Sequence, residues 1–238
     1  MIKIIDYLEF RVSGEIKQEI FGELLGSAKG YKYVYDSDFF TILTCSYGFV
    51  GENVHKMKVK NDLLYSWSIS DIIEEIKKSF VNIEKLEVSR IDLAYDFVYN
   101  KDIEYIKNIF KSRNVKRAKN YLYVSENFDS VETFYANKRG SDIYIRFYNK
   151  TKELVKSKKE YIKEYYKKNN LNGSVWRLEF QVNKKFSIND LNKVIDYDYL
   201  KFYFSIKNKN IKGLSIEYKE KSDYISICEL KRAYNILC

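Results

Sequence analysis

The chain has 238 residues, of which 45% are hydrophobic and 17% aromatic, enough apolar content for a folded protein with a sizeable core. It carries 42 Lys and Arg against 33 Asp and Glu, and the resulting net charge of +9 favours polyanionic partners, above all nucleic acid. The longest stretch without a charged residue, residues 39–51, is too short for a membrane-spanning helix. We therefore expect a cytoplasmic protein that does not associate with membranes.

The scarcity of histidine and cysteine excludes several kinds of site. The single histidine, His55, lies in no supporting motif, so we do not expect a Ser-His-Asp triad and interpret His55 as a surface or packed residue. The three cysteines form no Cys-x-x-Cys pair, which argues against a disulfide framework and against a zinc site of histidine and cysteine. Any catalytic metal must therefore use oxygen ligands.

Alternation of apolar and polar residues predicts a series of half-buried antiparallel strands. The predicted strands cover residues 4–12, 31–35, 40–46, 54–60, 86–98, 132–136, 142–148 and 175–182. Residues 131–136 and 143–149 are expected to form a hairpin whose tip, Lys138-Arg139-Gly140, is basic.

Apolar residues at helical spacing predict four helices between these strands. They cover residues 69–80, with Ser70 and Asp71 as candidate caps, residues 102–110, residues 151–168, and a segment that begins near Ser187. The expected fold is α+β, an antiparallel sheet with helices on one face, in a single domain of residues 1–238. Two pseudo-repeated lobes are an option, and residues 214–238 either complete the sheet or carry specificity.

Three of the predicted strands place polar side chains on the face opposite their apolar residues. The residues on this face are Arg90, Asp92 and Asp96, then Tyr144, Arg146, Tyr148 and Lys150, and then Arg177, Glu179 and Gln181. On spacing alone, a solvated sheet face with ordinary cross-strand ion pairs is the simpler interpretation. The combination of several carboxylates with cations and a tyrosine also suits a Mg²⁺ or Mn²⁺ site.

Three sequence blocks carry a resemblance to a known family. They are SRIDLAYDF at 89–97, TFYANKRGSDIYIRFYNKTKEL at 133–154 and WRLEFQV at 176–182, and the opening IDYLEFRV at 5–12 is similar to the first strand of the same family. In order and spacing the blocks resemble the replication initiation factor family. That family includes initiators of rolling-circle plasmid replication and related relaxases of conjugative elements, and the resemblance spans about residues 5–210.

This resemblance implies an enzyme that nicks one DNA strand at an origin and stays joined to the 5′ phosphate through a tyrosine, here Tyr148. It also implies that Asp92, Asp96 and Glu179 hold the Mg²⁺ or Mn²⁺ ion. Because a free tyrosine has a pKa near 10, we expect Arg146 and Lys150 to favour its phenolate form. Arg177 is expected to neutralise charge on the phosphate oxygens.

The expected DNA contacts are less specific. Lys138 and Arg139 are placed at the mouth of the site, and Tyr144 is a candidate for stacking on a base. Arg90, Lys116 and Arg117 are further candidates, although a solvated face explains the basic runs equally well. The expected partner is origin DNA with a hairpin or a single-stranded nick site, and a host helicase and a second copy of the chain are further candidate partners.

Two other functions remain open at this point. One is a non-catalytic module that binds an origin hairpin, and the other is a metal-dependent nuclease that uses an activated water instead of the tyrosine.

Overall fold

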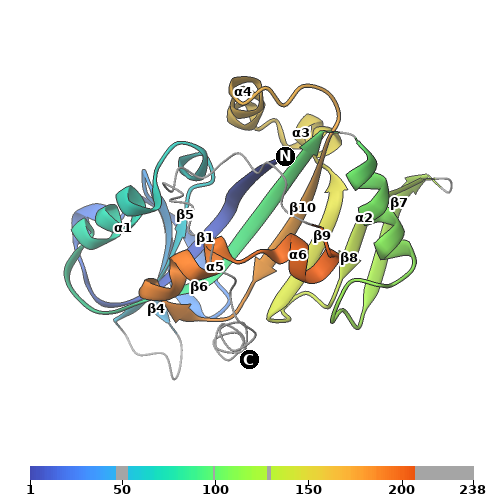
Figure 1. Ribbon diagram of the computed structural model, residues 1–238. Helices are drawn as coiled ribbons and strands as arrows, with labels where there is room; N and C mark the ends of the chain where they lie inside the picture. The colour runs from blue at the N-terminus through green and yellow to red at the C-terminus, as the bar shows by residue number, and fades with distance from the viewer. Residues whose placement is uncertain (47–52, 99, 128–129, 207–238) are drawn as a thin grey trace, which may run out of the picture.

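The computed structural model describes residues 1–46, 53–98, 100–127 and 130–206, so the expectation for residues 214–238 lies outside the described part. The strands form one antiparallel sheet in the order β2-β3-β4-β5-β1-β6-β10-β9-β8-β7, with the short β11 also pairing with β6 (Figure 1). In the described ranges, no helix is both long and apolar enough for a membrane span. The predicted α+β fold with an antiparallel sheet is confirmed.

Most strand boundaries lie close to the predicted ones. The strands are β1 (Ile2–Ile16), β2 (Glu23–Ala28), β3 (Tyr31–Asp36), β4 (Phe40–Ser46), β5 (Val54–Val59), β6 (Phe80–Val98), β7 (Tyr121–Asn127), β8 (Ser130–Ala136), β9 (Ile143–Asn149), β10 (Val175–Val182) and β11 (Phe186–Ser187). Strands β2 and β7 and the two-residue β11 were not predicted. In β2 the reason is plain, because its residues are almost all exposed and therefore show no alternation.

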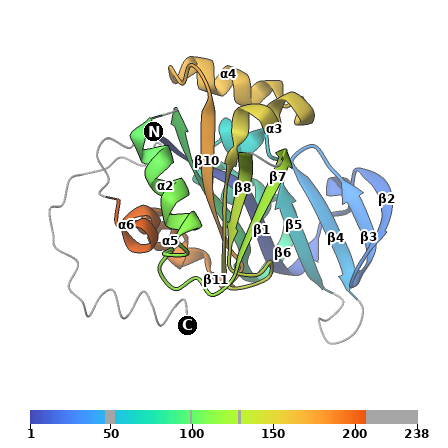
Figure 2. The same ribbon diagram turned by 90° about the vertical axis from the view of Figure 1, so that its right-hand side faces the viewer.

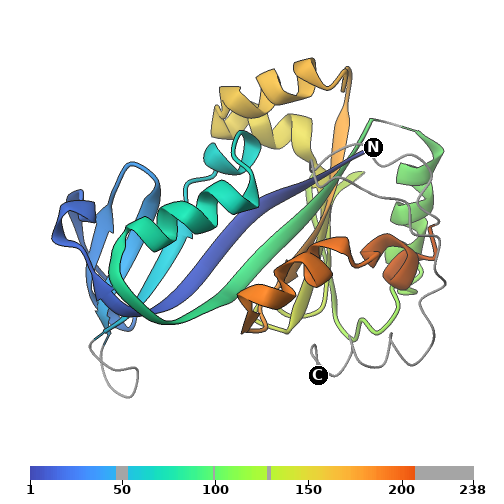
Figure 3. The same cartoon turned by 60° about the vertical axis from the view of Figure 1, so that its left-hand side comes forward.

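The two long strands β1 and β6 join the two wings of the sheet. They pair from Ile2 opposite Asp96 to Ile16 opposite Phe80, with several register shifts along the way. Strands β2–β5 lie beyond β1, and strands β7–β10 lie beyond β6 (Figure 3). The first register shift falls between Ile5 and Tyr7, where both Asp6 and Tyr7 leave the core side of the strand.

One face of the sheet carries the main core. Helices α1 (Ile69–Lys78), α2 (Lys101–Lys111), α5 (Leu191–Asp196) and α6 (Tyr199–Phe204) pack on it. Ile91, Leu93 and Tyr95 of β6 point into this core, as the alternation predicts. Helix α1 begins after Ser68, not Ser70, because Ser68 and Asp71 form a reciprocal capping box. Figure 2 shows α2, α5 and α6 on this side of the sheet.

The predicted helix 151–168 is two helices, and both lie on the opposite face of the sheet, so the expectation that all helices lie on one face is wrong. Helix α3 (Lys150–Ser157) ends at Lys158, whose φ of 54° is left-handed, and helix α4 (Glu160–Lys168) starts in a new direction. Each helix then buries its own apolar residues. Leu154 of α3 and Ile162 of α4 pack with Ile2 and Ile4 of β1 in a second, smaller core.

Candidate active site

Strand register arranges the polar face in three rows. Read from β9 through β10 to β6, the rows are Tyr148–Arg177–Asp96, Arg146–Glu179–Ala94 and Tyr144–Gln181–Asp92. Neighbouring rows are about 7 Å apart along the strands. The predicted faces are therefore right, but the face is not solvated at its centre, since Asp92, Asp96, Arg177 and Glu179 are all buried.

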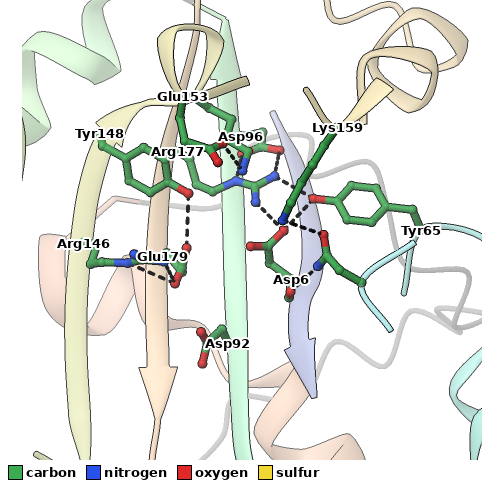
Figure 4. Close-up of polar contacts among 12 residues, drawn as sticks. Asp6, Tyr65, Asp92, Asp96, Arg146, Tyr148, Glu153, Lys159, Arg177 and Glu179 are labelled. Carbon is green, nitrogen blue, oxygen red and sulfur yellow. Dashed lines mark hydrogen bonds and ion pairs between the residues drawn. The ribbon is translucent and has the colours of Figure 1, made fainter. Parts of the chain in front are cut away.

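Glu179 links the tyrosine to an arginine (Figure 4). The Tyr148 hydroxyl donates a hydrogen bond to Glu179 Oε2 over 3.3 Å, and Arg146 donates to Glu179 Oε1 through Nε at 3.1 Å and also through Nη2. Burial, followed by the negative charge of Glu179, raises the pKa of Tyr148 well above its usual value. This is the reverse of the expected effect of Arg146 and Lys150, because burial and the carboxylate outweigh the cations.

A cleft of about 340 Å³ opens beside Tyr148. Tyr148, Arg146, Thr133 and Tyr135 line one side of it. The rest of the lining is Asp6, Asn149, Lys150, Lys152, Glu153, Lys156 and Lys159. The lining therefore holds more cations than carboxylates, which suits a phosphate-bearing ligand.

Lys150 lies in this lining but does not lie on the strand. It is the first residue of α3, which Asn149 caps by accepting a hydrogen bond from the Lys152 amide. Its ammonium group lies 2.6 Å from Glu153 Oε2, and burial, together with the charge of Arg177, lowers its pKa.

Arg177 is the centre of a buried ion cluster. Its guanidinium group lies 2.5 Å from Asp6 Oδ1, donates to Asp96 at 2.7 and 2.8 Å, and donates to the hydroxyl groups of Tyr65 and Tyr166. Tyr65 in turn donates to Asp6, and Tyr166 donates to Asp96. Arg177 has no exposed side-chain surface, so its bonds are all made within the protein.

Asp6, Tyr65 and Tyr166 were missed by the sequence reasoning. Asp6 left a signal, because Ile5 and Leu8 both face the core although strict alternation would separate them. This break marks the register shift that turns Asp6 towards Arg177. Tyr65 lies in a short 3-10 helix (Leu63–Tyr65) and Tyr166 lies on α4, and neither position carries a local signal of its role.

The three predicted metal ligands do not lie together. Asp92 and Asp96 share a face of β6, but four residues of a strand separate them by about 13 Å. Asp96 is bound by Arg177 and Tyr166, whereas Asp92 accepts two hydrogen bonds from Arg90 at 2.8 and 2.5 Å. Among the residues that the structure describes, no three carboxylate, imidazole or thiolate groups gather in a metal-binding arrangement.

Asp92 and Glu179, in contrast, lie close enough to interact. Burial raises the pKa of Asp92 to about 7, and the negative charge of Glu179 contributes to the rise. Mg²⁺ is commonly held by one or two carboxylates, substrate phosphates and waters, so the residues present fit a two-carboxylate site and not the predicted three-carboxylate site.

The predicted DNA contacts lie in different places. Lys138 and Arg139 form the tip of the β8–β9 hairpin, which is the end of β9 remote from Tyr148, so they do not lie at the mouth of the cleft. Lys116 and Arg117 lie over the Phe202 ring on the helix-covered side of the sheet. Arg90 lies 4.0 Å from the centre of the Tyr7 ring on the polar face.

Tyr144 and His55 lie in different parts of the sheet. Tyr144 lies on the polar face and stacks against Tyr135 of the neighbouring strand. His55 is buried, with Nδ1 2.7 Å from the Thr44 hydroxyl and Nε2 3.1 Å from the Gly14 carbonyl oxygen. These contacts give His55 a structural role.

A family model for the N-terminal part of a phage replication-associated protein matches residues 49–223, which is most of the chain and includes β6, β9 and β10 but not β1–β4. The chain belongs to this family. The expected membership in a family of replication proteins is thereby confirmed. No curated protein sequence is significantly similar to the chain.

A solved structure supports the fold of this replication-associated protein. The rolling circle replication initiator protein from Geobacillus stearothermophilus superposes with a TM-score of 0.56, and the match covers 99% of this chain and 96% of the other. Sequence identity is 14%, so the likeness concerns the fold and not the individual site residues.

Proposed function

We propose that this replication-associated protein initiates replication by nicking and rejoining one DNA strand at an origin, with Tyr148 as the nucleophile. The observation that carries the proposal is the Tyr148 hydroxyl beside a cation-rich cleft, with its hydrogen bond to Glu179. A nucleophile paired with a neighbouring base is the general arrangement for covalent catalysis. Membership in a replication family supports DNA as the substrate, and a host helicase and a second copy of the chain remain predicted partners.

The proposed step begins with a neutral phenol. Because the pKa of Tyr148 is raised, the phenol must lose its proton during the reaction, and Glu179 Oε2 is the acceptor within reach. The phenolate oxygen bonds to phosphorus, the bond from phosphorus to the 3′ oxygen breaks, and that oxygen takes a proton from water, whose hydroxide is neutralised by the proton that Glu179 releases. The reverse reaction reseals the strand without ATP, since the phosphotyrosine bond replaces one phosphodiester bond.

The surrounding residues take different roles in this proposal. Arg146, which is 35% exposed and lines the cleft, would contact the phosphate, and Lys150 would add positive charge at the start of α3. Arg177 is enclosed in protein, so we assign it the role of a positioning residue. Its ion pairs with Asp6 of β1 and Asp96 of β6 tie these two strands to β10, the strand that carries Glu179.

A divalent cation fits the proposal at Asp92 and Glu179. Mg²⁺ or Mn²⁺ held by these two carboxylates and a substrate phosphate would make the phosphorus more electrophilic. Asp96 is left out of this set, because it lies about 13 Å from Asp92 along β6 and its partner Arg177 has no exposed surface, whereas Arg90 and Arg146, the partners of Asp92 and Glu179, are partly exposed.

The test is a covalent adduct. Incubation with supercoiled DNA of the protein's own replicon and Mn²⁺, followed by denaturation, should leave protein joined to a 5′ end, and peptide mass spectrometry should locate the bond at Tyr148. The Tyr148→Phe variant should form no adduct and bind DNA almost normally. Tyr144→Phe, on the same strand and face, is the matched control and should form the adduct.

Other outcomes discriminate between the alternatives. If Tyr148→Phe forms the adduct in undiminished yield, Tyr148 is not the nucleophile. Free 5′ phosphate ends without an adduct indicate the hydrolytic nuclease, and DNA binding without any cut strand indicates the non-catalytic module.

A further inference from the structure

An aromatic and apolar patch lies on the polar face next to the cleft. The rings of Tyr135 and Tyr144 are nearly parallel, with 13° between their planes and 5.8 Å between their centres. Leu122 and Val124 of β7 extend the patch across the sheet, and their side chains are 59% and 45% exposed. We call Leu122, Val124, Tyr135 and Tyr144 the aromatic platform.

The aromatic platform is continuous with the site at Tyr148. Leu122 lies opposite Tyr135, and Tyr135 lies opposite Arg146, so one row of the sheet leads from the platform to the arginine that holds Glu179. In the next row, Val124 lies opposite Thr133, and Thr133 lies opposite Tyr148. Tyr135 and Thr133 also line the cleft. A ligand that reaches Tyr148 therefore has this surface beside it.

Helices leave this part of the face uncovered. Helices α1, α2, α5 and α6 pack on the opposite face, and α3 and α4 cover the polar face only beside the end of β9 that Tyr148 occupies (Figure 2). Exposed leucine and valine beside two stacked tyrosines form an apolar surface in a protein that is otherwise strongly charged.

The charges around the aromatic platform indicate its ligand. Arg146 lies between it and Glu179, and the positive charge of Arg139 at the hairpin tip acts on Tyr144. Aromatic rings interleaved with cations are the pattern that binds single-stranded nucleic acid, because bases stack on the rings while cations contact the phosphates. Bases within a duplex are already stacked on both sides and have no free face to offer.

We propose that the aromatic platform binds an unpaired nucleobase of the DNA strand that Tyr148 attacks, with Tyr135 and Tyr144 as the stacking residues. This inference rests on the proposed function, from which it takes DNA as the substrate. It adds a subsite next to the scissile phosphate that selects unpaired over paired DNA. The strand then follows β9, from Lys138 and Arg139 at the hairpin tip, past Tyr144, to Tyr148 and the lysines of α3. Lys138 and Arg139 would then contact phosphates of the bound strand at the hairpin tip, the end of β9 remote from Tyr148.

The experiment measures equilibrium binding of the full chain to a twelve-residue oligothymidylate and to a duplex of the same length, at one fixed ionic strength. Tyr135→Leu and Tyr144→Leu should each weaken binding to the single strand roughly 5- to 150-fold, the usual effect of losing a stacked base. Duplex binding should change little. Tyr135→Phe and Tyr144→Phe should bind the single strand like the wild type, because the ring face and not the hydroxyl carries the interaction.

A matched control and a second readout complete the test. Tyr33→Leu replaces another exposed tyrosine, on β3 and outside the cleft, and should leave single-strand affinity unchanged. In the wild type, a single 2-aminopurine in the oligothymidylate should lose fluorescence on binding when it stacks, and this loss should be smaller in the double leucine variant. The fluorescence measurement reports stacking of the base directly and does not depend on strand cleavage.

The proposal is overturned if both leucine variants keep wild-type affinity for the single strand, or if the phenylalanine variants lose as much as the leucine ones. It is also overturned if duplex binding falls in parallel. None of these measurements includes strand cleavage, so a failed aromatic platform with a normal Tyr148 adduct refutes only this inference. Normal stacking without any adduct refutes only the proposed nicking reaction.

Discussion

Two arginine clusters share the polar face and differ in one respect. Arg177 lies under α3 and α4 between Asp6 and Asp96 and has no exposed surface, whereas Arg146 and Arg90 are 35% and 26% exposed beside Glu179 and Asp92. The same pair of residue types thus builds a structural ion cluster in one place and an accessible site in the other. Burial under the two helices, and not residue type, decides which cluster is accessible to a substrate.

The largest expected effect comes from breaking the buried cluster. Arg177→Met leaves Asp6 and Asp96 charged and unpaired in the interior, and we expect a loss of about 3–5 kcal/mol in the free energy of unfolding. Urea denaturation followed by circular dichroism measures it. Arg90→Met is the matched control and should cost clearly less, because Asp92 can take up a proton near neutral pH. Equal losses in the two variants would contradict the division into two clusters.

A smaller effect should appear in the pH dependence of stability. The folded-state pKa of Asp92 is raised to about 7, so the folded state binds more protons than the unfolded state between about pH 4 and 7. The contribution of Asp92 to stability therefore falls as pH rises through this window. Urea unfolding between pH 4.5 and 8 should show this slope in the wild type and a flatter one in Asp92→Asn. Asp38→Asn, at an exposed position, should leave the slope unchanged.

Asp6 should behave in the opposite way. Arg177, with help from Lys150 and the Tyr65 hydroxyl, lowers its pKa despite burial. Its stabilising contribution is therefore complete above the unfolded value of about 4 and is lost only as pH falls through the lower folded value. Carbon-13 NMR of the two carboxyl groups should show Asp92 titrating near pH 7 and Asp6 still ionised at pH 4. An Asp92 carboxyl that titrates near pH 4 would contradict the difference between the clusters.

The sequence predicted the faces of the strands better than the positions along them. Alternation places Asp92, Asp96 and Glu179 correctly on one face, because side-chain direction is a local property of a strand. Whether two of them meet depends on the register between strands, and register is set by contacts far apart in the chain. Asp96 accordingly faces Arg177, one row away from Glu179 and two from Asp92.

Breaks in a regular pattern were the other source of error. The register shift at Asp6 and the left-handed residue Lys158 each change the direction of the chain within one or two residues. A hydrophobic stripe continues across Lys158, so its periodicity alone indicates one helix from 151 to 168. The break brings α3 and α4 together over the polar face, where they enclose Arg177 and border the cleft.

Removing the hydroxyl groups of Tyr166 and Tyr148 should have effects on stability of intermediate size. Tyr166 donates to Asp96 at 2.7 Å and accepts from Arg177 within the buried cluster, so Tyr166→Phe should cost about 1–3 kcal/mol of stability. The hydrogen bond of Tyr148 to Glu179 is long, and Tyr148→Phe should cost less than about 1 kcal/mol. Adduct formation should follow the reverse order, with Tyr166→Phe active at a temperature where it is folded. A stable Tyr166→Phe without any adduct would place Tyr166 in the active site instead.

The smallest expected effect lies at the rim of the cleft. Lys159 follows the break between α3 and α4, and its ammonium group donates to Asn61 at 3.2 Å. If the cleft binds the DNA backbone, Lys159→Gln should weaken DNA binding a few-fold and reduce the slope of log affinity against log salt concentration by about 1. Lys77→Gln, on an exposed position of α1, removes the same charge far from the cleft. Because both variants lower the net charge equally, a change in slope that appears in Lys159→Gln alone reports a phosphate contact at that position, whereas equal changes would mean that only the overall field of the protein is involved.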